Sequence, residues 1–468
     1  MKEDAFAAML PAIQTEARAR PVSVNRRIFR AAAWVGGAGV FVKFAAIFKE
    51  MAVAAVYGRS NAVEAFFAAA LIPALLVNLI AESMNQALVP TLVSVRELEG
   101  RERAQELFSN ALLCMCLLLV ASCCVAALAA HGFFPLIASH FSAAKLALSI
   151  RLFYGLLPVV LFTGVATLFA GVLNTFDRFA GPALAPMANS IAIILGALLL
   201  GSRLGIWAMV WATLAGALVH AALVASMMRT HGLRLMPRWH GMNDATREVA
   251  RQYGPVLLSG VVASGGMVVD QAMAAMLPAG SVSALVYANR FVSVALALVA
   301  GSVAAAVTPY FSGMIAHRDW TACRNSLRTW VRITLLGSTA AAVALIAGGK
   351  LLIRLALQHG AFGPHDTSVV ARVLAMYAIQ IPFFAASRVY YRFLVAIRRT
   401  DLVLYCGGIN LGLDVVLNLV LMRWLGVAGI ALATSLWAIS TFFFLGYWTR
   451  KLLPAASCVG TQPRGAID

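Results

Sequence analysis

The sequence alternates between long apolar segments and short polar ones. A membrane-spanning α-helix needs about 20 apolar residues to cross about 30 Å of hydrocarbon. Segments of this kind recur about twelve times, at residues 31–57, 62–94, 108–130, 150–173, 181–202, 205–228, 253–277, 284–312, 331–349, 369–394, 402–422 and 427–449. The pattern predicts an all-α polytopic membrane protein, because a helix satisfies its own backbone hydrogen bonds inside lipid.

Three places depart from a simple row of helices. The second span, 62–94, would be about 50 Å long as a straight helix, so we expect Pro73 and Pro90 to bend it. The glycine-rich segment Gly36–Gly39 favours a broken or flexible first helix. The longest polar loop contains the amphipathic piece NDATREVARQYG, which we expect to lie at the inner membrane surface.

The two halves of the sequence are similar to each other. SRLGIWAMVWATLAG at Ser202 matches RWLGVAGIALATSLW at Arg423, and ESMNQALVPTLVSV at Glu82 matches GSVAAAVTPYFSGM at Gly301, both about 220 residues apart. Transporters with such repeats have halves related by an axis along the membrane normal. We therefore predict two six-helix lobes related by a pseudo-twofold, arranged as a cytoplasmic N-terminal segment 1–30, an N-lobe 31–228, a cytoplasmic linker 229–252, a C-lobe 253–449 and a cytoplasmic tail 450–468.

The distribution of basic residues accounts for the net charge of +18 without a nucleic-acid partner. The chain is 61% apolar and 12% charged, against about 45–50% and about 25% in soluble domains. With the N-terminus inside, Lys and Arg concentrate in the inner loops and in both termini, as the positive-inside rule requires. We predict a multi-pass protein with both termini cytoplasmic and the first apolar segment retained as a signal anchor.

Charged residues stand within the first two spans. Lys43, Lys49, Glu50, Glu64 and Glu82 lie at or near membrane depth, where an isolated charge costs at least about 2.5–3.5 kcal/mol. Such charges must face a water-filled cavity or one another. The lysines are candidates for binding a phosphate, and the glutamates are candidates for gating partners. Structural ion pairs, or snorkelling of the adjacent Lys49 and Glu50 to an interface, are the alternatives.

Arginines occur at two places within spans of the second half. Arg290 lies a little inside the start of the eighth span. A guanidinium can grip a phosphate with two hydrogen bonds, so Arg290 would complete a phosphate clamp with Lys43 and Lys49; outward snorkelling is the alternative. Arg388 and Arg392 lie four residues apart near the inner end of the tenth span. Binding of anionic lipid headgroups and plain snorkelling explain this pair equally well.

A separate polar set also lies in the second half. Asp270 is deep in the seventh span, Asn410 and Asp414 share one face of the eleventh, and Thr434 is in the twelfth. Their oxygens are hard ligands, suited to a small cation or to proton exchange. An interhelical hydrogen-bond network is an equally good explanation. We expect no catalytic residues, no transition-metal site and no cofactor other than a sodium ion or a proton as the coupling ion.

The charged stretch from Lys43 to Pro90, with its K-x5-KE and AFFAAALIPALL segments, resembles the start of the MurJ/MviN family of lipid II flippases. Residues 157–186 (LPVVLFTGVATLFAGVLNTFDRFAGPALAP), 279–290 (AGSVSALVYANR) and 354–367 (RLALQHGAFGPHDT) are also similar to that family. The resemblance implies the fold of the multidrug/oligosaccharidyl-lipid/polysaccharide exporter superfamily. It also implies alternating access and an undecaprenyl-pyrophosphate-linked saccharide as the substrate.

The resemblance assigns roles to individual positions. The family's cavity cations fall on Lys43, Lys49 and Arg290, its acidic partners on Glu50, Glu64 and Glu82, and its sodium-type site on Asp270, Asn410, Asp414 and Thr434. The sequence departs from the family at Val77 and Asn78, where an arginine pair is usual, and at Asn289, where an acid is usual. The family's two extra C-terminal helices have no counterpart, so we expect a short member.

We therefore predict an alternating-access flippase, not an enzyme, that moves lipid II from the inner to the outer leaflet of the bacterial inner membrane. Alternatives are a flippase for an exopolysaccharide or O-antigen unit, a cation-coupled small-molecule exporter and a non-transporting scaffold. A membrane glycosyltransferase would carry acids in its outer loops, and the longest of these, 131–149 and 350–368, contain one acid, Asp366. The expected chain is a monomer whose partners are the lipid-linked saccharide, membrane lipids and cell-wall synthesis proteins.

Overall fold

A computed structural model describes residues 21–176, 179–230, 232, 235–316, 320–397 and 399–453. Residues 1–20 and 454–468, which hold most of the predicted N-terminal segment and tail, lie outside the described residues. The described chain contains helices and no β-strand. In chain order they are α2 (Pro21–Tyr57), α3 (Asn61–Leu76), the π-helical turn η1 (Val77–Glu82), α4 (Ser83–Leu98), α5 (Arg101–Ile137), α6 (Ala143–Asn174), α7 (Ala180–Leu184), α8 (Met187–Leu195), η2 (Gly196–Leu200), α9 (Gly201–Leu204), α10 (Trp207–Thr230), α11 (Asp244–Ala275), α12 (Ser281–Ala316), α13 (Trp320–Leu357), α14 (Pro364–Ala378), α15 (Gln380–Ala396), α16 (Thr400–Leu425) and α17 (Val427–Leu452).

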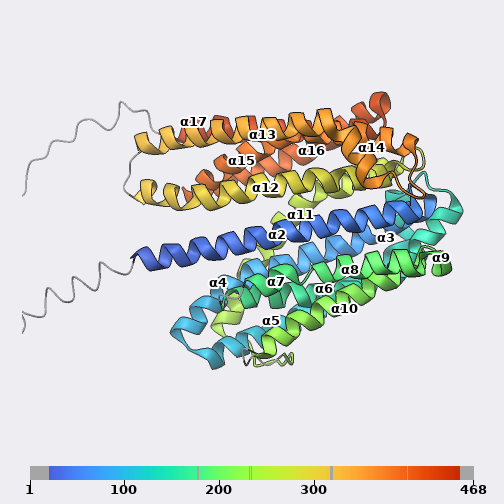
Figure 1. The fold of residues 1–468 in the computed structure, drawn as a ribbon. Coiled ribbons are helices and arrows are strands. Elements are labelled where there is room, and N and C mark those ends of the chain that lie inside the picture. Colours follow the sequence, from blue (N-terminus) through green and yellow to red (C-terminus); the bar gives the residue numbers. More distant parts are fainter. Residues whose placement is uncertain are drawn as a thin grey trace, which may run out of the picture.

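The long helices run side by side along one direction (Figure 1). Among the described residues, 11 helical segments are long and apolar enough to cross a membrane, and α2 is a further helix of 37 residues. The longest single helix, α13, has 38 residues, or about 57 Å at 1.5 Å per residue. Since hydrocarbon is about 30 Å thick, such a helix projects beyond it. The predicted all-α polytopic fold is confirmed.

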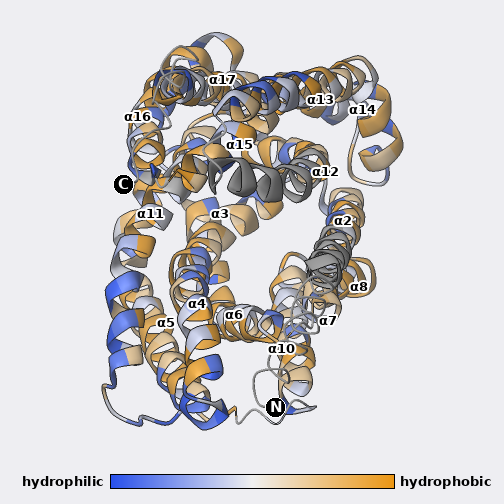
Figure 2. Cartoon of the chain, turned by 90° about the vertical axis from the view of Figure 1, so that its left-hand side faces the viewer, coloured by the Kyte–Doolittle hydropathy of each residue, from blue (hydrophilic) through white to orange (hydrophobic). Residues whose placement is uncertain are grey.

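Seen end-on, the helices gather in two groups (Figure 2). The first group contains α2 to α10, and the second contains α12 to α17. Helix α11 belongs to neither alone, because it contacts α4 and α5 as well as α16. The two groups correspond to the halves of the sequence, whereas their relation by a pseudo-twofold and the lobe boundaries stay predictions.

The first helix corrects an expectation from its glycines. Helix α2 runs from Pro21 to Tyr57 without interruption, so the predicted break at Gly36–Gly39 is wrong. A glycine within a helix costs about 0.5–1 kcal/mol relative to alanine. Inside lipid an unpaired backbone N–H or C=O group costs several kcal/mol, which exceeds a cost of this size.

The polar linker ends in a helix, and its place at the membrane surface stays a prediction. The amphipathic piece expected at the membrane surface forms the first turns of α11 and continues directly into the seventh span. Asn243 caps this helix, because its side-chain oxygen accepts the Thr246 N–H at 2.8 Å. The buried Asn110 of α5 donates to the Gly241 carbonyl at 2.9 Å and accepts the His240 N–H at 2.8 Å. The linker is therefore fixed to the first group.

The second span is one helical path, α3–η1–α4, of 38 residues. Pro73 lies inside α3 and Pro90 inside α4, with the π turn between them. On an ideal helix Glu64 and Glu82, 18 residues apart, would share a face. A π turn holds more residues than an α turn, so it rotates the side chains that follow it about the helix axis. Accordingly Glu64 is buried and Glu82 is exposed.

The end of the bundle opposite the two described chain ends, which we call the distal end, brings the two groups into backbone contact. The Ala361 N–H donates to the Ala55 carbonyl at 2.8 Å. The buried Tyr287 hydroxyl of α12 donates to the Gly58 carbonyl at 2.9 Å. These contacts join the last turn of α2 to the loop before α14 and to α12.

Gly360 is expected to be a sensitive position in this contact. Its φ is +59°, and a Cβ there would overlap the Ala55 carbonyl. Gly426 has the same φ with nothing within 4 Å, so Gly426→Ala isolates the cost of left-handed backbone, about 1–2 kcal/mol. We expect Gly360→Ala to lower the thermal midpoint of the purified protein by clearly more than Gly426→Ala. If both variants lower the thermal midpoint equally, the close contact between Gly360 and the Ala55 carbonyl is contradicted.

Candidate functional site

About two turns from the distal end of α2, a buried carboxylate joins the two helix groups. Glu50 is fully buried. Its Oε1 atom accepts from Lys49 Nζ at 3.0 Å and from Arg290 Nε at 3.1 Å. Arg290 comes from α12, 240 residues away in sequence. The structure thus brings these three predicted site residues together, and phosphate binding by them stays a prediction.

Lys43 lies on the same helix, seven residues before Glu50 and therefore on the same face. The charge of Arg290 acts on both Lys43 and Lys49. Three cations then share the region with one carboxylate, an excess of two positive charges. The Arg290 side chain is 44% exposed, whereas that of Glu50 is 1% exposed. An accessible guanidinium in a region of excess positive charge attracts an anion.

Glu64 of α3 holds the N-terminus of α12. Its Oε1 atom accepts the backbone N–H groups of Val282 at 2.8 Å and Ser283 at 3.3 Å. The first turn of a helix offers unpaired N–H groups and a partial positive charge, which stabilise a carboxylate. The other oxygen accepts Lys145 Nζ at 2.5 Å, and this ammonium group lies 3.7 Å from the centroid of the Phe141 ring. Glu64 therefore pairs with Lys145 and with the N-terminus of α12, and a gating role of Glu64 stays a prediction.

A second ion pair closes the distal end. Arg59 Nη1 binds Asp366 Oδ1 at 3.0 Å, and its Nε donates to the Gly280 carbonyl at 2.9 Å. Both partners of Arg59 belong to the second half of the chain. The described contacts of α2 and α3 with the second group thus concentrate at the distal end and at the Glu50 cluster.

Glu82 occupies a different position from the other two predicted gating acids. It ends η1 and is exposed, and the structure does not bring it to Glu50 or Glu64. Gln86, four residues later, shares its helix face and lines a pocket of the second group. A role of Glu82 in gating stays a prediction.

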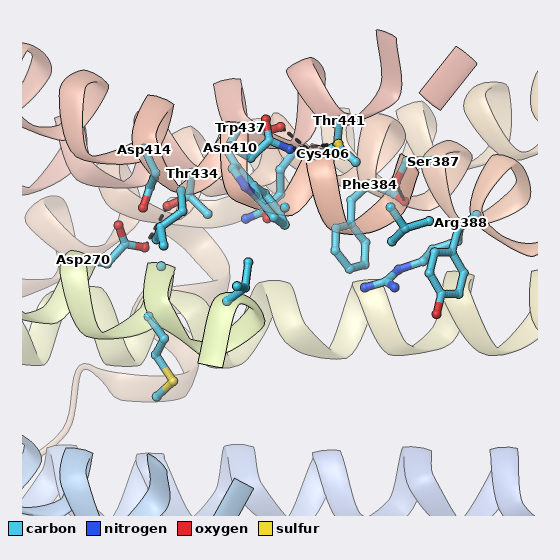
Figure 3. Close-up of a pocket in the computed structure, with 18 of the residues that line it drawn as sticks. Asp270, Phe384, Ser387, Arg388, Cys406, Asn410, Asp414, Thr434, Trp437 and Thr441 are labelled. Carbon is cyan, nitrogen blue, oxygen red and sulfur yellow. Dashed lines mark hydrogen bonds between the residues drawn. The ribbon is translucent and has the colours of Figure 1, made fainter. Parts of the chain in front are cut away.

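Two buried carboxylates lie side by side between α11 and α16 (Figure 3). Asp270 of α11 accepts from Asn418 Nδ2 at 2.8 Å and from Thr434 Oγ1 at 3.0 Å. Asp414 of α16 lies beside Asp270 (Figure 3). Adjacent buried carboxylates either stay ionised around a cation or share a proton, because two uncompensated negative charges repel each other.

The remaining oxygens of this set fit a cation. Asp414 Oδ1 and Asn418 Oδ1 are buried and have no hydrogen-bond donor within the described ranges. Carboxylate and amide oxygens are suitable ligands for a hard cation. The Asn410 amide nitrogen, one helical turn before Asp414, instead donates to Thr441 Oγ1 of α17 at 2.7 Å. The structure therefore groups Asp270, Asp414 and Thr434 as predicted, adds Asn418 and turns the Asn410 amide nitrogen elsewhere.

Two of these partners were not predicted from the sequence. Asn418 lies four residues after Asp414 on one helix face, so extension of the Asn410–Asp414 pattern by one turn would have found it. Lys145 is 81 residues from Glu64 and stands in what looks like an ordinary polar loop. No local signal in the sequence connects the two.

A pocket of about 780 Å³ opens next to Asp270, Asp414, Asn418 and Thr434, which we call the cation set. It lies among α11, α12, α15, α16 and α17, and Gln86 of α4 closes it from the first group. Figure 3 shows Asp270 and Asp414 at one end of this pocket and Arg388 at the other. Asn289, which precedes Arg290 of the phosphate-clamp candidate, also lines it.

The arrangement of long helices in two groups around these polar sites is that of a multi-pass membrane transporter. Two solved structures share the fold: a lipid II flippase MurJ in an inward closed conformation (23% identity, TM-score 0.76, 90% of this chain and 87% of that one) and an inward-facing multidrug resistance MATE transporter of the MOP superfamily (13% identity, TM-score 0.71, 90% and 96%). The family model for lipid II flippase MurJ matches residues 53–462. The chain belongs to this family of transporters.

Curated relatives agree with this assignment. The probable lipid II flippase MurJ of Rhizobium meliloti is 26% identical over 447 residues, covering 90% of this chain and 81% of the relative. The lipid II flippase MurJ of Burkholderia cenocepacia is 26% identical over 368 residues, covering 75% and 70%. The similarity that the MurJ/MviN-like motifs indicate is confirmed.

Proposed function

We propose that the chain moves an undecaprenyl-pyrophosphate-linked saccharide, lipid II first, from the inner to the outer leaflet of the bacterial inner membrane. Family membership supports a flippase of lipid II. The observation that carries the proposal is the pair of cations, Lys49 and Arg290, on the single buried carboxylate of Glu50, with Lys43 two turns earlier on the same face of α2. Its excess positive charge suits a pyrophosphate, while the polyprenyl tail stays in lipid.

The cluster also offers a way to link binding to movement. Glu50 and Arg290 join the two helix groups through one hydrogen bond. A pyrophosphate that binds Arg290 and Lys49 competes with Glu50 for the same donors. Substrate binding would therefore exchange a contact between the groups for contacts with the substrate, which changes their relative stability.

Release on the other side requires the distal end to open. In our proposal the distal end is the outer face, and both termini are cytoplasmic. Opening must break the Arg59–Asp366 pair and free the α12 N-terminus from Glu64. Moving one charge through 100 mV is worth about 2.3 kcal/mol, so the membrane potential or a cation at Asp270 and Asp414 can bias this step.

Lipid II transport can be tested in a bacterium depleted of its own lipid II flippase. The expected result is that expression of this chain restores growth and makes lipid II reactive toward an impermeant reagent at the outer face. If lipid II stays at the inner leaflet while another lipid-linked glycan crosses, the lipid II assignment is wrong. Efflux of a small cationic compound without any lipid-linked glycan would favour the exporter alternative.

Cation binding at Asp270 and Asp414 predicts a specific stabilisation. We expect sodium, compared with choline at equal ionic strength, to raise the thermal midpoint of the purified protein. A ligand at 100 times its Kd stabilises by about 2.7 kcal/mol, and Asp414→Asn should abolish this response because it removes a charged ligand. Asp401→Asn, on the exposed Arg399 pair, should keep it. A midpoint that does not respond to sodium would favour a proton.

A further inference from the structure

The pocket beside the cation set holds one basic side chain, Arg388 of α15, among its described lining residues. The Arg388 guanidinium lies 4.4 Å from the centroid of the Phe384 ring and 5.9 Å from that of Tyr391. The described chain places no acidic side chain within ion-pair distance of it. A cation at membrane depth without an acidic partner is costly and suggests that an anionic ligand fills the place.

The remaining lining is suited to a saccharide or peptide. Amide side chains of Gln86, Asn289 and Gln380 line the pocket together with aromatic rings such as Trp437 and Tyr391. Amides can exchange hydrogen bonds with hydroxyl and peptide groups, and aromatic faces pack against the apolar faces of sugar rings. A volume of about 780 Å³ falls within the range of about 300–1,000 Å³ that is typical of small-ligand sites.

The pocket also lies next to the place proposed for the pyrophosphate. Asn289 lines it, and the following residue, Arg290, binds Glu50. A headgroup whose pyrophosphate sits at Arg290 can therefore extend past Asn289 into the pocket. Arg388 lies at the end remote from the two carboxylates (Figure 3), where a terminal group of the headgroup would reach it.

We propose that this pocket is a headgroup subsite in which Arg388 binds a carboxylate of the transported saccharide or of its peptide. This inference rests on the proposed flippase function and deepens it, because it specifies a carboxylate-bearing headgroup. A guanidinium held against aromatic rings presents its N–H fork to a carboxylate with two parallel hydrogen bonds. Arg392, one turn further along α15, does not line the pocket, so only Arg388 is given this role.

The test measures binding of three lipids to the purified full chain by competition with a fluorescent prenyl pyrophosphate. The lipids are lipid II with free carboxylates, the same lipid with its carboxylates amidated, and undecaprenyl pyrophosphate without a headgroup. We expect the wild-type protein to prefer the free acid by about tenfold, the size of one charge-assisted hydrogen bond. R388Q should bind both headgroups equally and the bare pyrophosphate normally, and R388K should keep part of the preference.

R392Q is the matched control and should keep the full preference. If R388Q keeps it as well, or if the wild type binds all three lipids without preferring the carboxylate, the subsite is refuted while the flippase proposal stands. Loss of co-purified anionic phospholipid from R388Q with the preference unchanged would refute it in favour of a lipid-headgroup contact. A wild type that binds none of the three lipids would refute the flippase function and the subsite together.

Discussion

Arg290→Gln is expected to reduce translocation of a lipid-linked saccharide by at least about 100-fold in proteoliposomes. The change removes a guanidinium that would hold the pyrophosphate, and charge-assisted hydrogen bonds are worth about 1.5–3 kcal/mol each. It also leaves Glu50 buried with Lys49 as its sole remaining described ion-pair partner, which weakens the link between the helix groups. Arg151→Gln, on an exposed part of α6, is the control and should transport at the wild-type rate.

A double variant distinguishes two roles of the Glu50–Arg290 contact: a structural ion pair and a phosphate clamp. Glu50→Gln combined with Arg290→Gln removes the uncompensated carboxylate, so we expect the thermal midpoint to recover relative to Arg290→Gln alone. Transport should not recover, because the pyrophosphate still lacks its guanidinium. If stability and transport recover together, the cluster is structural and the clamp is wrong. Normal transport by Arg290→Gln itself would support the same conclusion.

The sequence was sufficient to predict the helical fold because span length and apolarity are local properties. A run of about 20 apolar residues must become a helix in lipid, whatever packs against it. The continuity of α2 was mispredicted because the glycines were given more weight than this requirement. The glycines of Gly36–Gly39 lower local helix stability, but a break there would leave backbone groups unpaired within an apolar span.

The site was predictable in its residue types and only partly in its pairings. Charges at membrane depth mark Glu50, Glu64 and Arg290 as special, whatever their partners are. Which partner each one takes depends on contacts across 81 residues for Glu64 and across 240 for Glu50. The π turn after Pro73 adds a register shift that no apolar pattern reports, and this shift separates Glu82 from the other two acids.

Lys145→Met is expected to destabilise the distal end by about 3–5 kcal/mol, because it leaves the buried carboxylate of Glu64 without its cation. The Glu64 side chain is 1% exposed and that of Lys145 is 7% exposed, so water cannot replace the lost partner. The α12 amides alone would then compensate the charge. We expect a lower thermal midpoint and faster labelling by an impermeant maleimide of a cysteine introduced at Ser283, which is fully buried.

The double variant Glu64→Gln, Lys145→Met tests whether the negative charge of Glu64 is needed, or only the hydrogen bond that its side-chain oxygen accepts from the α12 N-terminus. The side-chain amide that replaces the carboxylate can still accept the Val282 N–H through its oxygen, so the double variant should regain much of the thermal stability lost in Lys145→Met. The neutral amide binds a helix N-terminus more weakly than a carboxylate does. Labelling at position 283 should therefore stay faster than in the wild type. If labelling returns to the wild-type rate, the carboxylate of Glu64 is not what keeps the distal end closed, and the Arg59–Asp366 pair carries that role.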